Sequence, residues 1–427
     1  MSLKATEVFV PGSYPQHTYV EREGEGLESS LRDALNTPGQ VVSLSGPSKS
    51  GKTVLVERVV GRDFLIPISG ASLRSPEDVW TSALDWMDVP NTTSRSRSAA
   101  AKLNAQVGAK GTIGLPLVAK GELSGSTGGE IGGATGAEAV RERRGLAQVV
   151  DEISGSDFVI LLDDFHYMER SVQQEVAKGL KEAVRLGVKI ATASVSHRGD
   201  DVVRANPELR GRVRAIDLKY WDRAQLGRIP ITGFAALNAD LDPTAIGRLI
   251  DESAGSPQLM QLLCLQACFV LDLRVTHATM FSPKRITVPP STLQKILEQT
   301  SASTDFRSLV DVLDAGPRVR GTERKTYRFC DGTEGDVYRA VLNALADDPP
   351  RLSYPYEELL DRIVKICAGE SPVGSSVSGT CLHMMKLAQE KFPNERAVDW
   401  DETKQVLDLP DPYLLFYLRW SGRLKEK

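Results

Sequence analysis

Short apolar runs rich in β-branched residues alternate with amphipathic segments through the first half of the chain. The apolar runs cover 41–45, 64–68, 158–162, 188–195 and 213–218, and the helical segments between them cover 27–35, 76–87, 145–153 and 172–186. The run 158–162 is continuously apolar, which is typical of a strand buried on both faces of a parallel sheet. The alternation of strands and helices therefore predicts an α/β domain with a doubly wound parallel sheet.

The pattern becomes helical between residues 222 and 300, where segments 244–254, 257–273 and 291–297 predict a helical lid. The module that follows, 301–427, begins with a loop-like basic stretch at 316–335 and continues with helices at 336–346, 356–367 and 376–391. Two β-capable runs come next, at 396–400 and 413–420, and the segment 406–412 between them ends as a turn. This order predicts a C-terminal winged-helix-like domain.

Residues 91–140 differ from the rest because Ser, Thr and Gly crowd them and charges are few. We interpret them as a solvated surface insertion, and the alternative is a flexible β-ribbon that contacts another subunit or a substrate. The expected division is therefore an N-terminal segment at 1–25, an α/β core at 26–221 with this Gly-rich insertion, the lid at 222–300 and the winged-helix-like domain at 301–427.

Composition narrows the class of protein. The 427 residues are 41% hydrophobic and 25% charged with a net charge of −4, which argues against bulk coating of nucleic acid. The five cysteines include no C-x-x-C pair, which favours a reducing compartment over disulfides or a structural zinc. The apolar run 259–273 is too short to span a bilayer, and the first residues lack the apolar core of a signal peptide. We expect a cytoplasmic protein without a membrane partner.

The run 41–45 leads into a loop that fits the pattern G-x-x-x-x-G-K-[ST] between a strand and a helix. The loop consists of Gly46, Pro47, Ser48, Lys49, Ser50, Gly51, Lys52 and Thr53. Its glycines let successive backbone N–H groups curl around a phosphate, and the following helix adds its positive end. Lys52 is placed to bind the β- and γ-phosphates, and the Thr53 hydroxyl to ligate Mg²⁺. The pattern predicts a nucleoside triphosphate site; the alternative is a Gly-rich turn that precedes Lys-Thr by chance.

Two acids, Asp163 and Asp164, end the apolar run at 158–162. A carboxylate at the end of a buried strand downstream of the phosphate loop can hold the Mg²⁺ that bridges the β- and γ-phosphates. We assign Asp163 to the metal and Asp164 to orienting or activating the attacking water. Because Asp is shorter than the Glu common at this position, we expect slow hydrolysis.

Hydroxyl side chains end the next predicted strand. Ser194 and Ser196 lie where a polar group can reach the γ-phosphate or the attacking water, and capping of the following helix is an equal alternative. We interpret the remaining polar residues near these strand ends, His166, His197 and Arg198, as surface residues.

Two groups of basic residues suggest contacts beyond the single chain. Arg210 and Arg212 precede the run 213–218, where an arginine can cross a subunit boundary and stabilise the charge on a neighbour's γ-phosphate; we favour Arg212 for this role over a solvated basic turn. A second group, the cluster 318–328, contains Arg318, Arg320, Arg324, Lys325 and Arg328 around Tyr327. We interpret it as a solvated face, because acids lie nearby, with contact to a nucleic-acid backbone as the alternative.

These motifs together resemble the AAA+ and STAND branches of P-loop ATPases (STAND: signal-transduction ATPases with numerous domains). By this resemblance, 46–53 is Walker A and Asp163-Asp164 is Walker B. Residues 18–22 are similar to the N-terminal motif of the family, which implies that Tyr19 and Val20 pack near adenine. Residues 253–258 are similar to the Gly-x-Pro motif of the lid, which implies that Pro257 approaches the nucleotide.

Two further points refine the resemblance. Gln258 stands where many AAA+ relatives carry an arginine, which favours STAND over an AAA+ motor, and 411–419 resembles the end of the winged helix in archaeal- and bacterial-type STAND ATPases. The resemblance implies a sheet with an extra strand between the Walker A and Walker B strands. It also implies a switch, in which ATP and ADP favour different arrangements of the winged helix.

We therefore expect an ATPase that binds ATP and Mg²⁺, hydrolyses ATP slowly and uses the nucleotide to control assembly. Its expected partners are further copies of itself and an effector protein. One alternative is a DNA-binding AAA+ regulator of the replication or transposition type, which would use 318–328 and the winged helix. Another is a nucleotide-gated scaffold that does not hydrolyse ATP.

Overall fold

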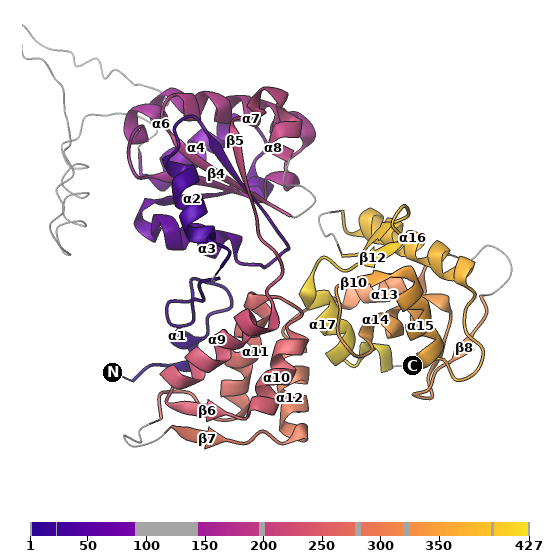
Figure 1. Cartoon of the computed structure of the whole chain (residues 1–427). Coiled ribbons are helices and arrows are strands. Elements are labelled where there is room, and N and C mark those ends of the chain that lie inside the picture. The colour runs from indigo at the N-terminus through magenta and orange to yellow at the C-terminus, as the bar shows by residue number, and fades with distance from the viewer. Residues whose placement is uncertain are drawn as a thin grey trace, which may run out of the picture.

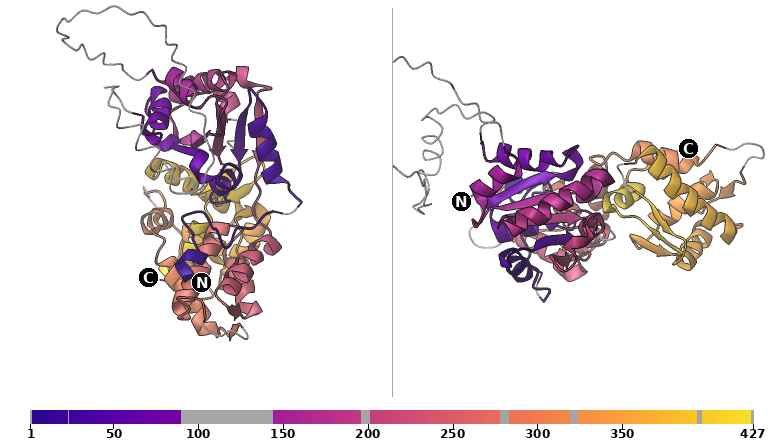
Figure 2. Two further views of the ribbon diagram at one scale, coloured as in Figure 1. Left: turned by 90° about the vertical axis from the view of Figure 1, so that its left-hand side faces the viewer. Right: turned by 90° about the horizontal axis from the view of Figure 1, so that it is seen from above.

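The computed structural model describes residues 2–22, 24–89, 144–195, 201–277, 283–318, 324–393 and 397–425. An α/β domain, a mainly helical lid and a C-terminal domain follow one another along the chain, and Figure 1 shows the C-terminal domain beside the lid. The turned views of Figure 2 show the same three parts. The predicted insertion at 91–140 lies outside the described residues.

A five-stranded parallel sheet forms the centre of the α/β domain. Its strands are β1 (Val41–Ser45), β2 (Leu65–Ser69), β3 (Val159–Asp163), β4 (Lys189–Ser194) and β5 (Val213–Asp217). They lie in the order β2-β3-β4-β1-β5, with β4 between β1 and β3. This order confirms the predicted α/β class and the extra strand between the two motif-bearing strands. It also brings the carboxyl ends of β1, β3 and β4 to one edge of the sheet.

Helices cover both faces of this sheet, and each face has its own hydrophobic cluster. The helices are α2 (Leu27–Asn36), α3 (Lys52–Val60), α4 (Glu77–Trp86), α6 (Leu146–Ile153), α7 (Arg170–Arg185) and α8 (Asp201–Ala205). One cluster joins the sheet to α2 and α3, and the other joins it to α4, α6 and α7. Apolar residues at helical spacing on α7, such as Val176 and Leu180, explain why that helix packs here.

In its described residues the lid contains four helices and, contrary to prediction, two short strands. The helices are α9 (Arg223–Ala236), α10 (Pro243–Glu252), α11 (Pro257–Val270) and α12 (Pro290–Ser301). Strands β6 (Ala239–Leu241) and β7 (Lys284–Ile286) pair in parallel. The pattern did not reveal α9, which carries Pro230 inside it. Proline removes a backbone donor, and it normally argues against a helix interior.

The N-terminal segment packs against the lid. A short helix, α1 (Ala5–Val8), precedes Phe9, whose ring lies 5.1 Å from that of Phe234 on α9. The Thr18 hydroxyl, also buried, accepts a hydrogen bond of 2.7 Å from the Gln261 side chain on α11. Residues at the start of the chain therefore belong to the hydrophobic cluster of the lid.

The C-terminal domain surrounds a separate hydrophobic cluster. Its elements are α13 (Arg307–Ala315), β8 (Tyr327–Arg328), β9 (Glu334–Gly335), α14 (Val337–Ala346), β10 (Ser353–Pro355), α15 (Tyr356–Ile366), α16 (Gly374–Lys391), β11 (Asp399–Asp401), β12 (Val406–Asp408) and α17 (Pro412–Trp420). A three-stranded antiparallel sheet has the order β10-β12-β11. The pattern predicted α14, α15 and α16 but not α13 or the short strand pair.

The prediction of a strand at 413–420 is wrong, because this run forms α17. Asp411 caps the helix by accepting a 2.9 Å hydrogen bond from the Tyr413 backbone N–H, and Pro412 occupies the first helical position. The run is buried on all sides, and a short continuous apolar run has no periodicity that separates a strand from a buried helix. The partner of β11 is β12, which lies in the segment predicted to end as a turn.

Among the described residues, no helix is long and apolar enough to cross a membrane.

The packing of the N-terminal segment on the lid can be tested at a glycine of α9. A Cβ at Gly233 would overlap the Phe9 ring and lie 2.9 Å from the Thr18 methyl carbon. We expect Gly233→Ala to lower the free energy of unfolding by about 1–3 kcal/mol, measured by chemical denaturation. The matched control, Gly247→Ala on α10, should not destabilise, because only the mobile end of Arg223 faces that position. Equal stability of the two variants would contradict this packing.

Candidate nucleotide site

A cavity of about 510 Å³ opens at the carboxyl edge of the sheet. Its walls come from the phosphate loop and the start of α3, from the ends of β3 and β4, and from the N-terminal segment. Trp221, Ile229 of α9 and the start of α11 complete them. Of the predicted site residues, these walls include Tyr19, Val20, Ser48, Lys49, Ser50, Gly51, Lys52, Thr53, Asp163, Asp164, Ser194 and Pro257. The fold thus gathers segments that are far apart in the sequence around one hollow.

The backbone of the phosphate loop explains its glycines. Gly46 has φ +156°, and a Cβ there would lie 2.8 Å from the Leu218 backbone oxygen, so the loop must pass β5 without a side chain. Gly51 at φ +95° and Lys49 at φ +61° are left-handed. Alternation of left- and right-handed residues turns successive N–H groups toward one point and makes a concave anion-binding surface.

Polar groups in the loop are arranged for an anion. The Lys52 ammonium donates hydrogen bonds of 3.0 Å and 2.8 Å to the carbonyl oxygens of Gly46 and Pro47, so it lies over the loop. Burial lowers the pKa of Lys52, while Asp163 and Asp164 oppose that shift. Among the described residues, the buried Ser50 hydroxyl has no hydrogen-bond partner. An unpartnered buried hydroxyl and a partly buried ammonium in one loop fit a phosphate group.

Thr53 and Asp163 meet at the predicted metal position. The Thr53 hydroxyl, in the first turn of α3, donates a 2.7 Å hydrogen bond to Oδ2 of Asp163 at the end of β3. Oδ1 of Asp163 accepts from the backbone N–H of Asp164 at 2.9 Å. These two oxygen donors can serve Mg²⁺ together with phosphate oxygens and water. No cluster of three or more His, Cys, Asp or Glu capable of holding a metal occurs in the described ranges, so any such ion would rely on these additional oxygens.

Asp164 lies in a different environment from Asp163. Its backbone is left-handed at φ +56°, and a Cβ on Gly70 would lie 2.5 Å from its carbonyl oxygen, so Gly70 makes room for this turn. Burial, followed by the charge of Asp163, raises the pKa of Asp164, and Lys52 acts in the opposite direction. A carboxylate with a raised pKa is a better proton acceptor than an ordinary aspartate.

Aromatic and apolar side chains also contribute to the cavity wall. The Tyr19 ring stacks on Tyr14 with 6.0 Å between ring centroids, and its hydroxyl donates a 2.6 Å hydrogen bond to Glu28 on α2. Val20 and Pro257 line the same cavity from the N-terminal segment and from the first turn of α11. Such a wall suits a flat heterocycle such as a nucleotide base.

Other predicted residues lie elsewhere. Arg212 is exposed at the start of β5, opposite the start of β1, so it lies at the far edge of the sheet from the phosphate loop of its own chain. Arg210 is also exposed. Ser196, His197 and Arg198 lie outside the described residues, as does Arg320.

Sequence reasoning missed Trp221, which contacts the phosphate loop directly. Its indole N–H donates a 2.9 Å hydrogen bond to the Ser50 carbonyl oxygen, and the Arg22 guanidinium lies 5.6 Å from its ring centroid. Gln261, buried on α11, was also missed; it lines the cavity and joins Thr18 to the lid. A Trp directly after the last strand of the sheet, at a domain junction, is a signal that could have found the first of these.

Comparisons with known proteins bear on the fold. Neither a protein-family model nor a curated protein matches the sequence. Among solved structures, the Walker-type ATPase PABY2304 of Pyrococcus abyssi is similar with a TM-score of 0.51 at 14% identity, over 94% of this chain and 97% of that one. Cdc6p from Pyrobaculum aerophilum (TM-score 0.43, 15% identity, 98% of both chains) and the ORC2 protein of Aeropyrum pernix (0.46, 12%, 98% and 97%) are less similar. The topology, the phosphate loop and the first likeness identify the α/β fold of P-loop nucleoside triphosphatases.

The raised pKa of Asp164 means that its ionised form lowers the free energy of unfolding, and this effect can be measured. Because the folded-state pKa lies above the unfolded one, the ionised carboxylate destabilises the fold above that pKa, and the penalty fades as the pH falls and both states become protonated. Asp164→Asn keeps a residue that tolerates φ above zero, so we expect its melting temperature to exceed wild type by about 2–5 °C near pH 8 and to match it near about pH 4. Asp163→Asn, which weakens the Thr53 contact, should not stabilise. A lower melting temperature for Asp164→Asn at pH 8 would contradict this reasoning.

Proposed function

We propose that this chain is a P-loop ATPase that binds Mg-ATP, hydrolyses it slowly and acts as a STAND-like switch for assembly. The observation that carries the proposal is the hydrogen bond of 2.7 Å between Thr53 and Asp163, near the partly buried ammonium of Lys52. It joins the loop after β1 to the end of β3 where a Mg-triphosphate needs oxygen ligands. Aromatic and apolar side chains in the wall of the same cavity suit the base.

In this proposal each residue has a separate role. The loop amides and Lys52 bind the phosphates, Thr53 and Asp163 hold Mg²⁺, and Asp164 orients and deprotonates the attacking water. Ser194, buried at the end of β4, lines the same region and contacts the γ-phosphate or this water. The bound Mg²⁺ supplies charge neutralisation of the phosphates.

Assembly and signalling extend the proposal beyond one chain. Arg212 is exposed and distant from its own phosphate loop, so its proposed role is in the site of a neighbouring subunit. Gln258, next to Pro257 in the cavity wall, supports a switch that does not sense the nucleotide through an arginine at this position of the lid. The order α14, β10, α15, α16, β11, β12 supports the proposed winged helix, and an effector protein is the proposed receiver of the signal.

The nucleotide site can be tested by removing the ammonium group. We expect Lys52→Ala to lower ATP affinity at least about 100-fold, because a buried charge partner of the phosphates is lost. Titration with a fluorescent ATP analogue measures affinity, and phosphate release measures turnover. The control Lys178→Ala removes an exposed lysine of α7 and should behave as wild type. Unchanged ATP affinity in Lys52→Ala would refute the assignment of the nucleotide site. In a second test, phosphate release by Asp164→Asn at the wild-type rate would refute the role of Asp164.

The alternative of a DNA-binding regulator is favoured by one feature, a pocket of about 500 Å³ in the C-terminal domain. Arg318, Arg324, Lys325 and His383 line it, with the first turn of α16. Two of these cations are engaged, however, since Arg324 binds Asp336 at 2.6 Å and Lys325 pairs with Glu370.

Duplex binding separates the two functions. A DNA-binding regulator should bind labelled duplex in the ATP state at low salt, with an affinity that falls steeply as salt rises. Arg318→Gln and Arg328→Gln together should then weaken binding and reduce the salt slope by about 2. Fluorescence anisotropy makes the measurement. Absence of binding at low salt would exclude this alternative and leave the switch.

A further inference from the structure

Helix α17 lies between two hydrophobic clusters. Tyr413 and Phe416 belong to the cluster of the lid, and Leu414, Leu415 and Leu418 belong to the cluster of the C-terminal domain. Figure 1 shows α17 at the junction of these two parts. Separation of the lid from the C-terminal domain would therefore expose both cores to water.

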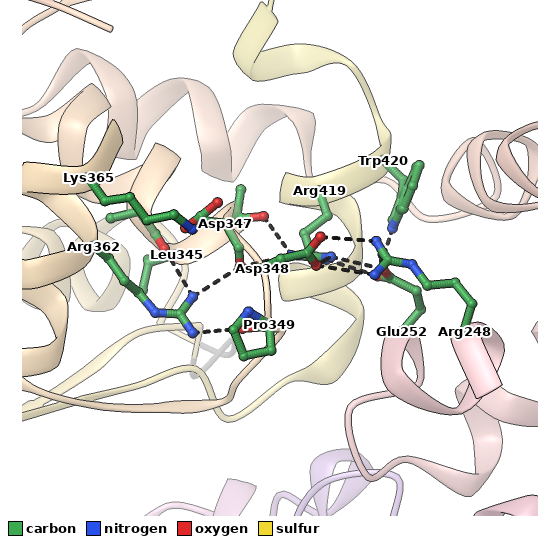
Figure 3. A network of polar contacts seen from close by, with 12 residues as sticks. Arg248, Glu252, Leu345, Asp347, Asp348, Pro349, Arg362, Lys365, Arg419 and Trp420 are labelled. Carbon is green, nitrogen blue, oxygen red and sulfur yellow. Dashed lines mark hydrogen bonds and ion pairs between the residues drawn. The ribbon is translucent and has the colours of Figure 1, made fainter. Parts of the chain in front are cut away.

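Polar contacts hold the carboxyl end of α17 to the lid. The carboxylate of Glu252, at the end of α10, is fully buried and accepts hydrogen bonds of 2.8 Å and 2.9 Å from Arg419 and of 2.7 Å from the Trp420 indole N–H. Arg248 approaches the same carboxylate at 2.9 Å, and Asp348 of the C-terminal domain binds Arg419 at 2.5 Å. Figure 3 shows these five residues converging. Breaking a buried, multiply bonded ion pair is strongly unfavourable.

The α/β domain is packed separately. Its two hydrophobic clusters consist of residues between 27 and 218 and include none from the lid or the C-terminal domain. Helix α17 and a buried ion pair thus join the lid to the C-terminal domain, whereas among the described residues no hydrophobic cluster joins the α/β domain to either. Movement between the parts is therefore easiest at the junction of the α/β domain with the other two.

The amino end of α17 contacts the phosphate loop across this junction. The Lys49 ammonium lies 2.6 Å from Oδ2 of Asp411 and 4.3 Å from the centroid of the Tyr413 ring. Both ionic side chains are mostly shielded from water, at 29% and 23% exposure. Lys49 is one of the left-handed residues that give the loop its shape. Trp221, between β5 and α9, donates a hydrogen bond to the carbonyl oxygen of the next residue, Ser50.

We propose that Asp411 and Tyr413 are positioning residues for the phosphate loop, through which the C-terminal domain and a bound nucleotide influence each other. This inference rests on the proposed function of the site. The docked arrangement already contains the nucleotide cavity between the loop and the lid. The Lys49–Asp411 contact and the nucleotide therefore stabilise the same arrangement, and loss of either weakens the other.

Asp411→Asn tests this with little disturbance of α17, because asparagine caps a helix as well as aspartate. Asp411 is not among the residues that line the cavity, so its effect on a nucleotide is indirect. We expect ATP and ADP affinities to fall about three- to tenfold, the effect of one partly shielded ion pair. In the nucleotide-free protein, hydrogen exchange should speed up at the amides of 46–51 while the melting temperature stays within about 2 °C of wild type.

Asp157→Asn is the matched control, since it breaks the ion pair of 3.1 Å with Lys189 within the α/β domain. It should leave nucleotide affinity and loop exchange unchanged. The double variant Lys49→Gln with Asp411→Asn should bind nucleotide no more weakly than Lys49→Gln alone, because both changes remove one contact.

Three results would overturn the inference: wild-type affinity and exchange in Asp411→Asn, tighter nucleotide binding in that variant, or additive losses in the double variant. Failure of the proposed function is distinct from these results. In that case wild type itself would bind no nucleotide, and Lys52→Ala would not differ from it.

Discussion

The buried carboxylate of Glu252 is the group on which the arrangement of lid and C-terminal domain depends. It accepts hydrogen bonds from Arg419 and Trp420 and pairs with Arg248, so donors from two parts of the molecule compensate one charge. A carboxylate removed from water without partners would destabilise the fold by several kcal/mol. The donors therefore fix the position of α17 relative to α10, and the apolar faces of α17 fill the cores on either side.

The position of the lid has a direct consequence for the cavity. Glu252 ends α10, and a short connection leads to Pro257, which begins α11 and lines the cavity. On the opposite wall, Thr53, Asp163 and Lys52 are fixed by the sheet and by α3. A ligand between these walls would contact a side held by the sheet and a lid side whose position is set by the C-terminal domain. This separation of roles suits a switch, in which binding energy is used to choose an arrangement.

The sequence alone predicts an element or a site residue where the local residue pattern and the side-chain chemistry indicate the same structure. Five parallel strands, the loop at Gly46–Thr53 and the two acids at the end of β3 could be predicted, because most of these strands read as apolar runs and their carboxyl ends share an edge. Run 413–420 was mistaken for a strand because its burial on all sides removed the helical period. Helix α9 was missed because of Pro230, and Trp221 because its partner is a backbone carbonyl that no residue pattern encodes. The contact of Lys49 with Asp411 spans 362 positions and depends on tertiary packing alone.

The core of the lid contains residues from both ends of the sequence, which affects the order in which the domains can fold during synthesis. This core contains Ala5 and Phe9 from near the start of the sequence, the helices of 223–301, and Tyr413 and Phe416 from α17. The α/β core needs only residues between 27 and 218, so it can close while synthesis continues. The core of the lid is complete only after α17 has been synthesised. A nascent chain can therefore complete the core of the α/β domain before it completes the core of the lid.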